Sequence, residues 1–365
     1  MRVVVNQGEL EDKLVMASKA IAKKSVKPVL AGFLFDISED FKILATDMET
    51  GVKATVIANE IEGEAKFVVE AAMILDIVKN LPDDIVTLEY EGETLEIYSG
   101  RSHFSLATMD ASEFPELASA DVESYIEIDT STLDEMIDKV IFAAATDEFM
   151  KNLNGVFWEF MENSLRLVAS DGFRLALMEQ EVEQSTQLSF LISLKSMKEL
   201  QNVISNTSEP SVRLRFDGKR LSLEAGDVEV TMRVVDADFP DYRRVLPAEY
   251  NTRILASRDE ILSALKRVMV IAKRGSDAVK VSAAEGALVL SSRSPDYGEA
   301  VEELEADVEG QEIAAAFNPK FLTEAIRRVD TPEVEMLFVS ETAPLKVKPS
   351  EREDYFYIIM PIRMA

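Results

Sequence analysis

Ile43-Leu44-Ala45-Thr46-Asp47 has two counterparts further along the chain. Leu167-Val168-Ala169-Ser170-Asp171 follows 124 residues later, and Leu288-Val289-Leu290-Ser291-Ser292 follows after another 121 residues. Short apolar runs of this kind are typical of buried β-strands. A run that returns after about 120 residues indicates a repeated domain, because a repeat of this length can bury a core of its own.

Each of the three runs lies between two segments with helical periodicity. Before each run, apolar residues recur at the spacing of one helix face. These faces are formed by Leu10, Leu14, Ala17 and Ile21, by Leu133, Ile137, Val140 and Ala144, and by Ile261, Leu265, Val268 and Ala272. After each run, an apolar strand leads into a second helical segment, within 67–81, 190–204 and 315–329. The sequence therefore predicts the same domain three times.

The composition is that of a globular chain. It has 365 residues, of which 47% are apolar and 29% charged, and this length suits two or three domains. No apolar run approaches the length of about 18 residues that a membrane-spanning helix needs, and residues 1–30 contain no run of signal-peptide length. Cysteine is absent and His103 is the only histidine, so we expect no metal cluster. We expect a cytoplasmic protein with no cofactor and no membrane partner.

The net charge of −28 is unevenly distributed along the chain. Six predicted helices, at 9–27, 70–80, 131–146, 193–206, 258–274 and 318–329, carry a combined formal charge of +5, which leaves −33 for the rest. If equivalent helices share one surface, their cations form a basic face suited to phosphate groups. The helices at 70–80 and 131–146 are acidic and count against uniformity, and the alternative is ordinary solvated helix faces. The candidate cations are Lys23, Lys24, Lys79, Lys195, Lys198, Lys266, Arg267, Lys273, Arg327 and Arg328.

Alternating strand patterns fill the rest of each repeat. Residues 85–90 turn at Glu91-Gly92 into 94–98, and residues 212–216 turn at Asp217-Gly218 into 221–224. Two helices against antiparallel strands define an α+β domain, with helices on one face and a sheet on the other. We predict three such domains, at 1–120, 121–247 and 248–365, joined through 118–122 and 246–252. Helices on one side and strands on the other describe the wall of a ring.

Six short motifs occur in a fixed order along the chain. They are Ala45-Thr46-Asp47-Met48-Glu49, Ser99 to Leu106, Ala169 to Ala176, Asp238 to Pro247, Phe317 to Leu322 and Met360 to Arg363. Together they resemble the bacterial sliding clamp, the beta subunit of the DNA polymerase III holoenzyme, over essentially the whole chain. The resemblance implies the DNA clamp fold and a non-catalytic processivity subunit in DNA replication.

The resemblance also implies partners. It implies a head-to-tail homodimer whose ring encircles double-stranded DNA without reading its sequence, with the cations above facing the duplex. It implies contacts with the replicative polymerase catalytic subunit, the clamp-loader complex, and other polymerases and repair proteins through short peptide motifs. At the dimer interface it places Phe104 and Leu106 against Val270 and Ile271 of the partner subunit. The alternative for these four residues is the core of a single subunit.

A partner-peptide pocket between domains two and three is implied as well. Its apolar residues offer a cleft for leucine or aromatic anchors, and its arginines can meet carbonyl or carboxylate groups. Core packing between the two domains is the alternative for the apolar members. Phe173 and Phe321 depart from residues common in the family, which could change the peptide preference. The residues are Leu153, Ser170, Gly172, Phe173, Arg174, Leu175, Pro240, Arg244, Val245, Phe321, Met360, Pro361, Ile362 and Arg363.

Two other classes of function compete with this one. Asp47, Glu49, Asp171 and Asp241 could in principle hold two metal ions for phosphodiester chemistry. Asp47 and Asp171 occupy equivalent positions in separate repeats, however, so they lie a domain apart. Phosphate-binding glycine loops and nucleophile motifs are absent from the sequence. A peptide-binding scaffold unrelated to DNA would keep the pocket but would not need cations on equivalent helices.

Overall fold

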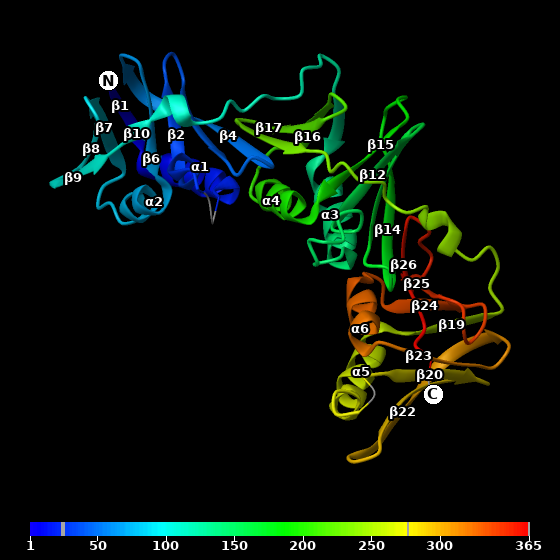
Figure 1. The fold of residues 1–365 in the computed structure, drawn as a ribbon. Coiled ribbons are helices and arrows are strands. Elements are labelled where there is room, and N and C mark those ends of the chain that lie inside the picture. Colours follow the sequence, from blue (N-terminus) through cyan, green and yellow to red (C-terminus); the bar gives the residue numbers. More distant parts are fainter. Residues whose placement is uncertain (23–25, 276, 364–365) are drawn as a thin grey trace. The chain divides into compact units, whose positions relative to one another are not determined.

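The same succession of elements occurs three times in the computed structural model, which describes residues 1–22, 26–275 and 277–363 (Figure 1). The first repeat contains β1 (Arg2–Asn6), α1 (Gln7–Ala17), β2 (Gly32–Ile37), β3 (Phe41–Thr46), β4 (Thr50–Val56), β5 (Ala58–Glu62), β6 (Ala65–Glu70), α2 (Ala71–Lys79), β7 (Ile85–Glu91), β8 (Thr94–Ser99), β9 (Ser102–Ala107) and the short β10 (Met109–Asp110). The second contains β11 (Ile126–Asp129), α3 (Thr130–Val140), β12 (Gly155–Met161), β13 (Ser164–Ser170), β14 (Arg174–Glu181), β15 (Leu188–Ser193), α4 (Leu194–Ile204), β16 (Ser211–Phe216), β17 (Arg220–Ala225) and β18 (Val228–Arg233). The third contains β19 (Thr252–Ser257), α5 (Arg258–Ala272), β20 (Val279–Ala284), β21 (Ala287–Ser294), β22 (Gly298–Gly310), β23 (Ile313–Phe317), α6 (Pro319–Arg328), β24 (Glu333–Phe338), β25 (Leu345–Pro349) and β26 (Tyr355–Ile359). The predicted threefold α+β repeat is confirmed.

The three runs that open the sequence lie on equivalent strands, β3, β13 and β21. Their alignment in the third repeat needs one correction. Leu167 pairs with Met178 across the β13–β14 hairpin, and Leu290 pairs with Glu302 at the corresponding place of the β21–β22 hairpin. Leu290, and not Leu288, is therefore the counterpart of Leu167. The sequence alignment slipped by two residues because a shift of two keeps every side chain on the same face of a strand.

The predicted helix at 9–27 was too long. α1 ends at Ala17, where the Ser18 hydroxyl donates to the Val15 carbonyl at 2.6 Å. Lys27 is extended, because the following Pro28 disfavours helical geometry in the residue before it. α3 likewise ends at Val140 and α5 at Ala272, earlier than predicted. Lys23 and Lys24 lie outside the described residues.

These shorter helices change the charge argument. Within their observed bounds, the six α-helices carry eleven lysine and arginine residues and eleven aspartate and glutamate residues. The helices are therefore neutral rather than positive, and the excess of −28 belongs to the rest of the chain. The predicted segregation of charge has the right direction but was overestimated.

Two compact units make up the chain: residues 1–134 with 195–234, and residues 135–194 with 235–365. The first unit holds a five-stranded sheet in the order β5-β1-β7-β8-β9 and a nine-stranded sheet in the order β10-β6-β2-β3-β4-β18-β17-β16-β11. The second unit holds twelve strands in the order β15-β12-β13-β14-β26-β25-β24-β19-β22-β21-β20-β23. In the first unit α1 packs beside α2 and against β3 and β4, and in the second α5 packs beside α6 and against β21 and β22 (Figure 1). No helix among the described residues is long and apolar enough to cross a membrane.

The core of each unit lies between its helices and its sheets. Leu10 and Leu14 on α1, and Ile261 and Leu265 on α5, are buried, as the helical periodicity predicted. Burial of one such side chain contributes about 1.5–3 kcal/mol. The two predicted hairpins, β7–β8 and β16–β17, are also confirmed by their antiparallel pairing.

Sheets continue from one repeat to the next by a fixed rule. β4 of the first repeat pairs with β18, the last strand of the second, and Val52 lies opposite Val230. β14 of the second repeat pairs with β26, the last strand of the third, and Leu175 lies opposite Ile358. Both junctions are antiparallel and use main-chain hydrogen bonds, so the first and second repeats each supply an edge that the following repeat covers.

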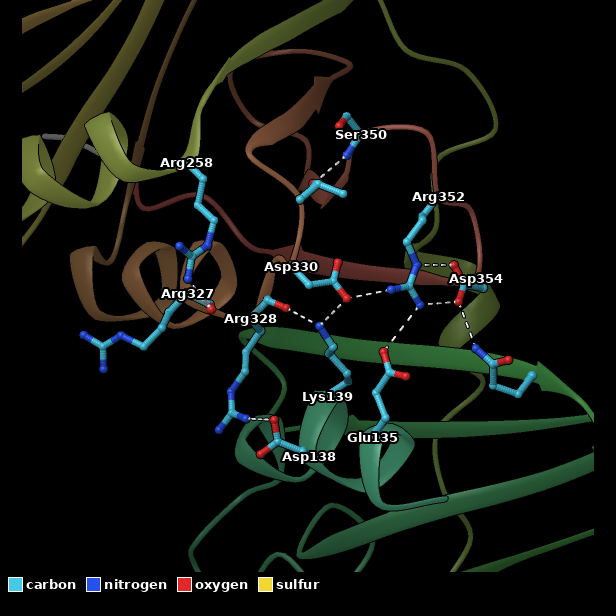
Figure 2. A network of polar contacts seen from close by, with 12 residues as sticks. Glu135, Asp138, Lys139, Arg258, Arg327, Arg328, Asp330, Ser350, Arg352 and Asp354 are labelled. Carbon is cyan, nitrogen blue, oxygen red and sulfur yellow. Dashed lines mark hydrogen bonds and ion pairs between the residues drawn. The ribbon is translucent and has the colours of Figure 1, made fainter. Parts of the chain in front are cut away.

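A polar network fixes the end of α6 in the second unit (Figure 2). The buried Lys139 on α3 donates to the Arg328 carbonyl at 2.6 Å and to Asp330 at 3.1 Å. Arg352 binds Asp330 at 2.6 Å and Asp354 at 2.6 Å. The hydrogen bond from Arg352 lowers the pKa of Asp354. Burial alone would raise the pKa of Asp330, but Lys139 and Arg352 hold it below its ordinary value.

We predict that Arg352→Gln lowers the stability of the protein and flattens its dependence on pH. Because the folded-state pKa values of Asp330 and Asp354 are lowered, their contribution is complete above about pH 4, the ordinary range of aspartate, and is lost as the pH falls through the folded values. Loss of the charge-assisted hydrogen bonds should cost about 1–3 kcal/mol at neutral pH. Urea unfolding at several pH values and one protein concentration measures both effects. Arg244→Gln, which removes an exposed arginine, is the control, and equal acid sensitivity in Arg352→Gln and the native protein would contradict the prediction.

Candidate functional site

The turn between β13 and β14 shapes one wall of the predicted pocket. The Ser170 hydroxyl donates to the Arg174 carbonyl at 2.7 Å and accepts from the Gly172 N–H at 3.1 Å. Asp171 Oδ1 accepts from the N–H groups of Phe173 and Arg174 at 3.0 and 3.1 Å. Gly172 has a φ of +87°, which glycine adopts without steric cost. The motif Ser170 to Arg174 thus encodes a rigid turn.

Arg174 supports this wall from behind. Its side chain is buried, and its Nε, Nη1 and Nη2 donate to Asp171 at 2.9 Å, to the Tyr357 hydroxyl at 3.1 Å and to the Phe142 carbonyl at 2.8 Å. Nη1 also pairs with Glu324, and the guanidinium lies 4.5 Å from the centre of the Phe321 ring. Burial alone would lower the pKa of Arg174, but its contacts with Tyr357 and Glu324 raise it. All three nitrogens are engaged within the chain, so Arg174 holds the wall in place rather than offering a free guanidinium to a ligand.

Tyr242 forms part of the floor. Its hydroxyl donates to Glu159 at 2.7 Å and accepts from Arg166 Nη1 at 2.7 Å. Burial, together with the hydrogen bond to Glu159, raises the pKa of Tyr242 to about 12, so the phenol stays neutral. Phe239 stacks on Phe157 with ring centres 5.0 Å apart and fixes the linker that precedes Tyr242.

These elements enclose a mainly apolar cavity of about 140 Å³ in the second unit. Eight predicted residues line it: Leu153, Ser170, Gly172, Arg174, Leu175, Pro240, Val245 and Met360. Four further lining residues were missed: Phe239, Asp241, Tyr242 and Ile358. Three of these belong to the motif 238–247, of which only Pro240, Arg244 and Val245 were chosen. A volume of this size accommodates one or two apolar side chains.

The structure does not bring the other predicted residues into the cavity lining. Phe173 is 66% exposed at the turn, and the exposed Arg244 pairs with Asp241 at 3.0 Å. Phe321 lies against Arg174. Pro361, Ile362 and Arg363 continue past the cavity, where the Ile362 N–H donates to the Ala316 carbonyl at 2.7 Å. These residues can contact only a ligand that extends beyond the cavity.

The predicted DNA-facing cations divide into free and paired groups. Lys266, Lys273 and Arg327 line one groove between α5 and α6. Lys79 on α2 and Lys198 on α4 are exposed. In contrast, Arg267 is held by Glu302 at 2.6 and 2.8 Å, Arg328 pairs with Asp138, and Lys195 pairs with Asp47. Among the residues that the structure describes, cations without an ion-pair partner therefore lie on or next to helices of both units.

The four predicted interface residues differ in exposure. Phe104 on β9 is 37% exposed and forms a shallow groove with Met73 and Ile77 of α2, and Val270 on α5 is 61% exposed. Ile271 is half-buried. Leu106, however, is buried within the first unit, so core packing accounts for it without a partner. Among the described residues, no group of three His, Cys, Asp or Glu side chains is placed to hold a metal ion.

The tripled α+β architecture and its edge-to-edge junctions define a DNA clamp fold. Models of the DNA polymerase III beta subunit match the chain in three parts: the N-terminal domain at 1–118, the central domain at 127–241 and the C-terminal domain at 243–363. The chain belongs to the DNA polymerase III beta subunit family, whose members are non-catalytic processivity clamps.

Individual relatives agree with this membership. The DNA polymerase III beta subunit of Thermotoga maritima is 55% identical, covers 100% of both chains and superimposes with a TM-score of 0.95. The DNA polymerase sliding clamp of Bacillus subtilis has a TM-score of 0.95 at 26% identity, again over 100% of both chains. The beta sliding clamps of Proteus mirabilis and Staphylococcus aureus are 28% and 30% identical, over 100% and 94% of each chain.

Proposed function

We propose that this chain is a sliding clamp that confers processivity on a replicative DNA polymerase by encircling duplex DNA. The observation that carries the proposal is the clamp fold over the whole chain, shared at 55% identity with the Thermotoga maritima beta subunit. Its partners would be DNA and the polymerase catalytic subunit, and also the clamp loader and repair proteins, in the cytoplasm. The proposed domains are 1–120, 121–247 and 248–365.

In both units the last strand of one repeat covers a sheet edge of the repeat before it, and this junction rule supports a head-to-tail homodimer. β4 and β14 are each covered by the last strand of the following repeat. Their counterpart in the third repeat is the first half of β22. This half pairs with β21 on one side. On its other side the described residues supply no neighbour, because β19 pairs only with the second half of β22. β9, the last long strand of the first repeat, is a sheet edge. A second copy of the chain supplies the missing neighbour of each, which gives a heterologous contact that closes after two subunits.

The free helix cations support DNA as the threaded partner. Lys266, Lys273 and Arg327 converge on one groove. Lysine and arginine contacts to phosphates carry no sequence information, so a duplex can be retained without being fixed in register. A peptide-binding scaffold unrelated to DNA has no use for such a cluster, and this favours the clamp.

The apolar cavity supports the docking of short peptides. Leu153, Leu175, Val245 and Met360 offer apolar walls, and methionine adapts to side chains of different shape. The rigid turn at Gly172 and the buried Tyr242 keep the cavity formed without a ligand. We propose that it accepts a leucine or aromatic anchor, and that Phe173, Arg244 and the segment 361–363 contact the rest of the peptide.

We predict that replacing Lys266, Lys273 and Arg327 by alanine weakens the retention of the clamp on DNA. The retention that remains should also depend less steeply on salt. Loss of three phosphate contacts should reduce the slope of log K against log salt by up to about 3 units per subunit. The measurement is retention on nicked circular DNA after loading, at increasing salt. A variant with Lys42, Lys66 and Lys219 replaced by alanine loses the same charge outside the helices and serves as control. Equal retention in the helix variant and the control would refute these contacts.

For assembly, the junction rule predicts the register of the subunit contact. By analogy with Val52 opposite Val230, Ala300 should lie opposite Phe104 of the partner subunit. The chain has no cysteine, so Phe104→Cys with Ala300→Cys should form intersubunit disulfides under mild oxidation.

The matched control for this cross-link is Phe104→Cys with Val301→Cys. A shift of one residue turns the second thiol to the opposite face of the sheet, so it should not cross-link. Non-reducing electrophoresis and sedimentation give the result. Absence of a covalent dimer in the first variant, with the protein folded, would rule out the proposed register.

For the pocket, we predict that deletion of residues 360–365 removes most of the affinity for a peptide with leucine and phenylalanine anchors. We expect a Kd near micromolar for the full chain, about −8 kcal/mol, and loss of the Met360 wall should weaken binding by at least about 30-fold. Calorimetry measures the affinity, and deletion of 364–365 alone is the control. If both truncated proteins bound the peptide as the full chain does, the peptide site would lie elsewhere.

A further inference from the structure

The turn that shapes the apolar pocket is built a second time, between β3 and β4. The Thr46 hydroxyl donates to the Thr50 carbonyl at 2.8 Å and accepts from the Met48 N–H at 3.0 Å. Asp47 Oδ1 accepts from the N–H groups of Glu49 and Thr50 at 2.9 and 2.8 Å. Met48 has a φ of +80°. Each bond and angle matches the one described for Ser170 to Arg174.

The other walls are repeated as well. The Arg233 N–H at the end of β18 donates to the Glu49 carbonyl at 2.9 Å, as the Met360 N–H after β26 donates to the Phe173 carbonyl at 2.9 Å. Phe114-Pro115-Glu116-Leu117 stands where the other junction has Phe239-Pro240-Asp241-Tyr242. Together these elements enclose a cavity of about 250 Å³ within the first unit. The same four-part architecture therefore forms a cavity at each junction.

The chemistry of the second cavity is different. Arg233 takes the place of Met360, and Arg220 lies directly opposite Arg233 across the β17–β18 hairpin. Burial alone would raise the pKa of Asp217, but the N–H groups of Lys219 and Arg220 donate to it and lower its pKa, and the charge of Arg220 adds to this. Within the described residues, neither the Arg220 nor the Arg233 guanidinium forms a salt bridge or donates a hydrogen bond. Two like charges in directly opposed positions destabilise a sheet. An anion bound between them relieves this repulsion.

The remaining lining residues restrict what that anion can be. Met48 is 48% exposed, and Leu117 lies so close to Gly51 that a Cβ there would come within 2.8 Å of Leu117 Cδ2, so an apolar surface adjoins the arginines. Glu49 and Glu116 also line the cavity. Their charges repel a polyanion such as DNA more strongly than a single carboxylate, whose repulsion two guanidinium groups can offset.

We propose that the cavity between the first and second repeats is a second docking site, which takes a short peptide with an apolar residue near one acidic side chain. The carboxylate binds Arg220 and Arg233, and the apolar residue packs on Met48 and Leu117. The choice of a peptide as ligand rests on the proposed function of the apolar pocket. The preference for an acidic residue rests on the arginine pair alone.

Each cavity is lined by a different methionine, Met48 in the first unit and Met360 in the second, so the methyl signal of each reports binding in its own cavity. In ¹³C-methyl-methionine spectra of the full-length protein, the Met48 and Met360 signals are assigned by Met48→Leu and Met360→Leu. The probe acetyl-Leu-Gly-Asp-amide should shift the Met48 signal in a saturable way. Acetyl-Leu-Gly-Asn-amide, which lacks the charge, should bind about tenfold more weakly, because two charge-assisted hydrogen bonds are lost. The leucine and phenylalanine peptide should shift Met360, so a failure of that pocket appears separately.

Two variants complete the experiment. Arg220→Ser with Arg233→Ser should abolish the Met48 response to the aspartate probe, whereas Arg213→Ser with Lys219→Ser, which removes two charges outside the cavity, should preserve it. Arg233→Met gives this wall the residue of the other cavity and should erase the preference for aspartate over asparagine even if the double variant is unstable. The proposal is overturned if Met48 does not respond, if both probes bind equally, if Arg233→Met keeps the preference, or if only duplex DNA shifts Met48.

Discussion

Main-chain pairing between successive repeats is the constraint on which the rest of this structure depends. A sheet edge exposes unpaired N–H and C=O groups, and each junction satisfies them by adding the last strand of the next repeat. β4 with β18 and β14 with β26 follow this rule in the two units. Because the bonds are made by the backbone, the junction tolerates wide variation in side chains. This explains how relatives with 26% identity keep the same fold.

The junctions also create the two cavities. A strand added at an edge brings the residue at its end beside a neighbouring turn, and the linker between the two repeats closes the remaining side. Met360 beside Gly172 and Arg233 beside Met48 are the two results. The hydrogen bonds between side chain and backbone that hold the two turns agree in length within a few tenths of an ångström, whereas the exposed side chains of the turns differ completely. One scaffold thus presents an apolar cavity at one junction and an arginine pair at the other.

The sequence predicted what depends on local pattern. Helix faces such as Leu10 with Leu14, and hairpins such as 85–98, follow from periodicity and turn residues. It could not predict what depends on register between distant strands. Ile358 enters the apolar cavity only because it pairs with Leu175, and Arg174 is neutralised by Glu324, which is 150 residues away. Helix ends were also misjudged, since after Ala17 the chain continues as a short 3-10 helix at Ser18–Ala20, a change that periodicity does not detect.

Because the helices are neutral, the inner face of the proposed ring would attract DNA less strongly than a basic lumen would. Outside the helices the chain carries −28, so a duplex is repelled from most of the surface. A neutral helix layer does not need to attract the duplex strongly. The duplex favours this layer because it repels DNA less than the acidic surface around it does. The unpaired cations, among them the cluster Lys266, Lys273 and Arg327, would then bind phosphates weakly, and such contacts would break at little cost as the duplex moves. Paired cations such as Arg267, held by Glu302, would add little, which keeps the total attraction low. Topology rather than affinity would hold such a clamp on DNA, and a few weak contacts without sequence preference are what free sliding requires.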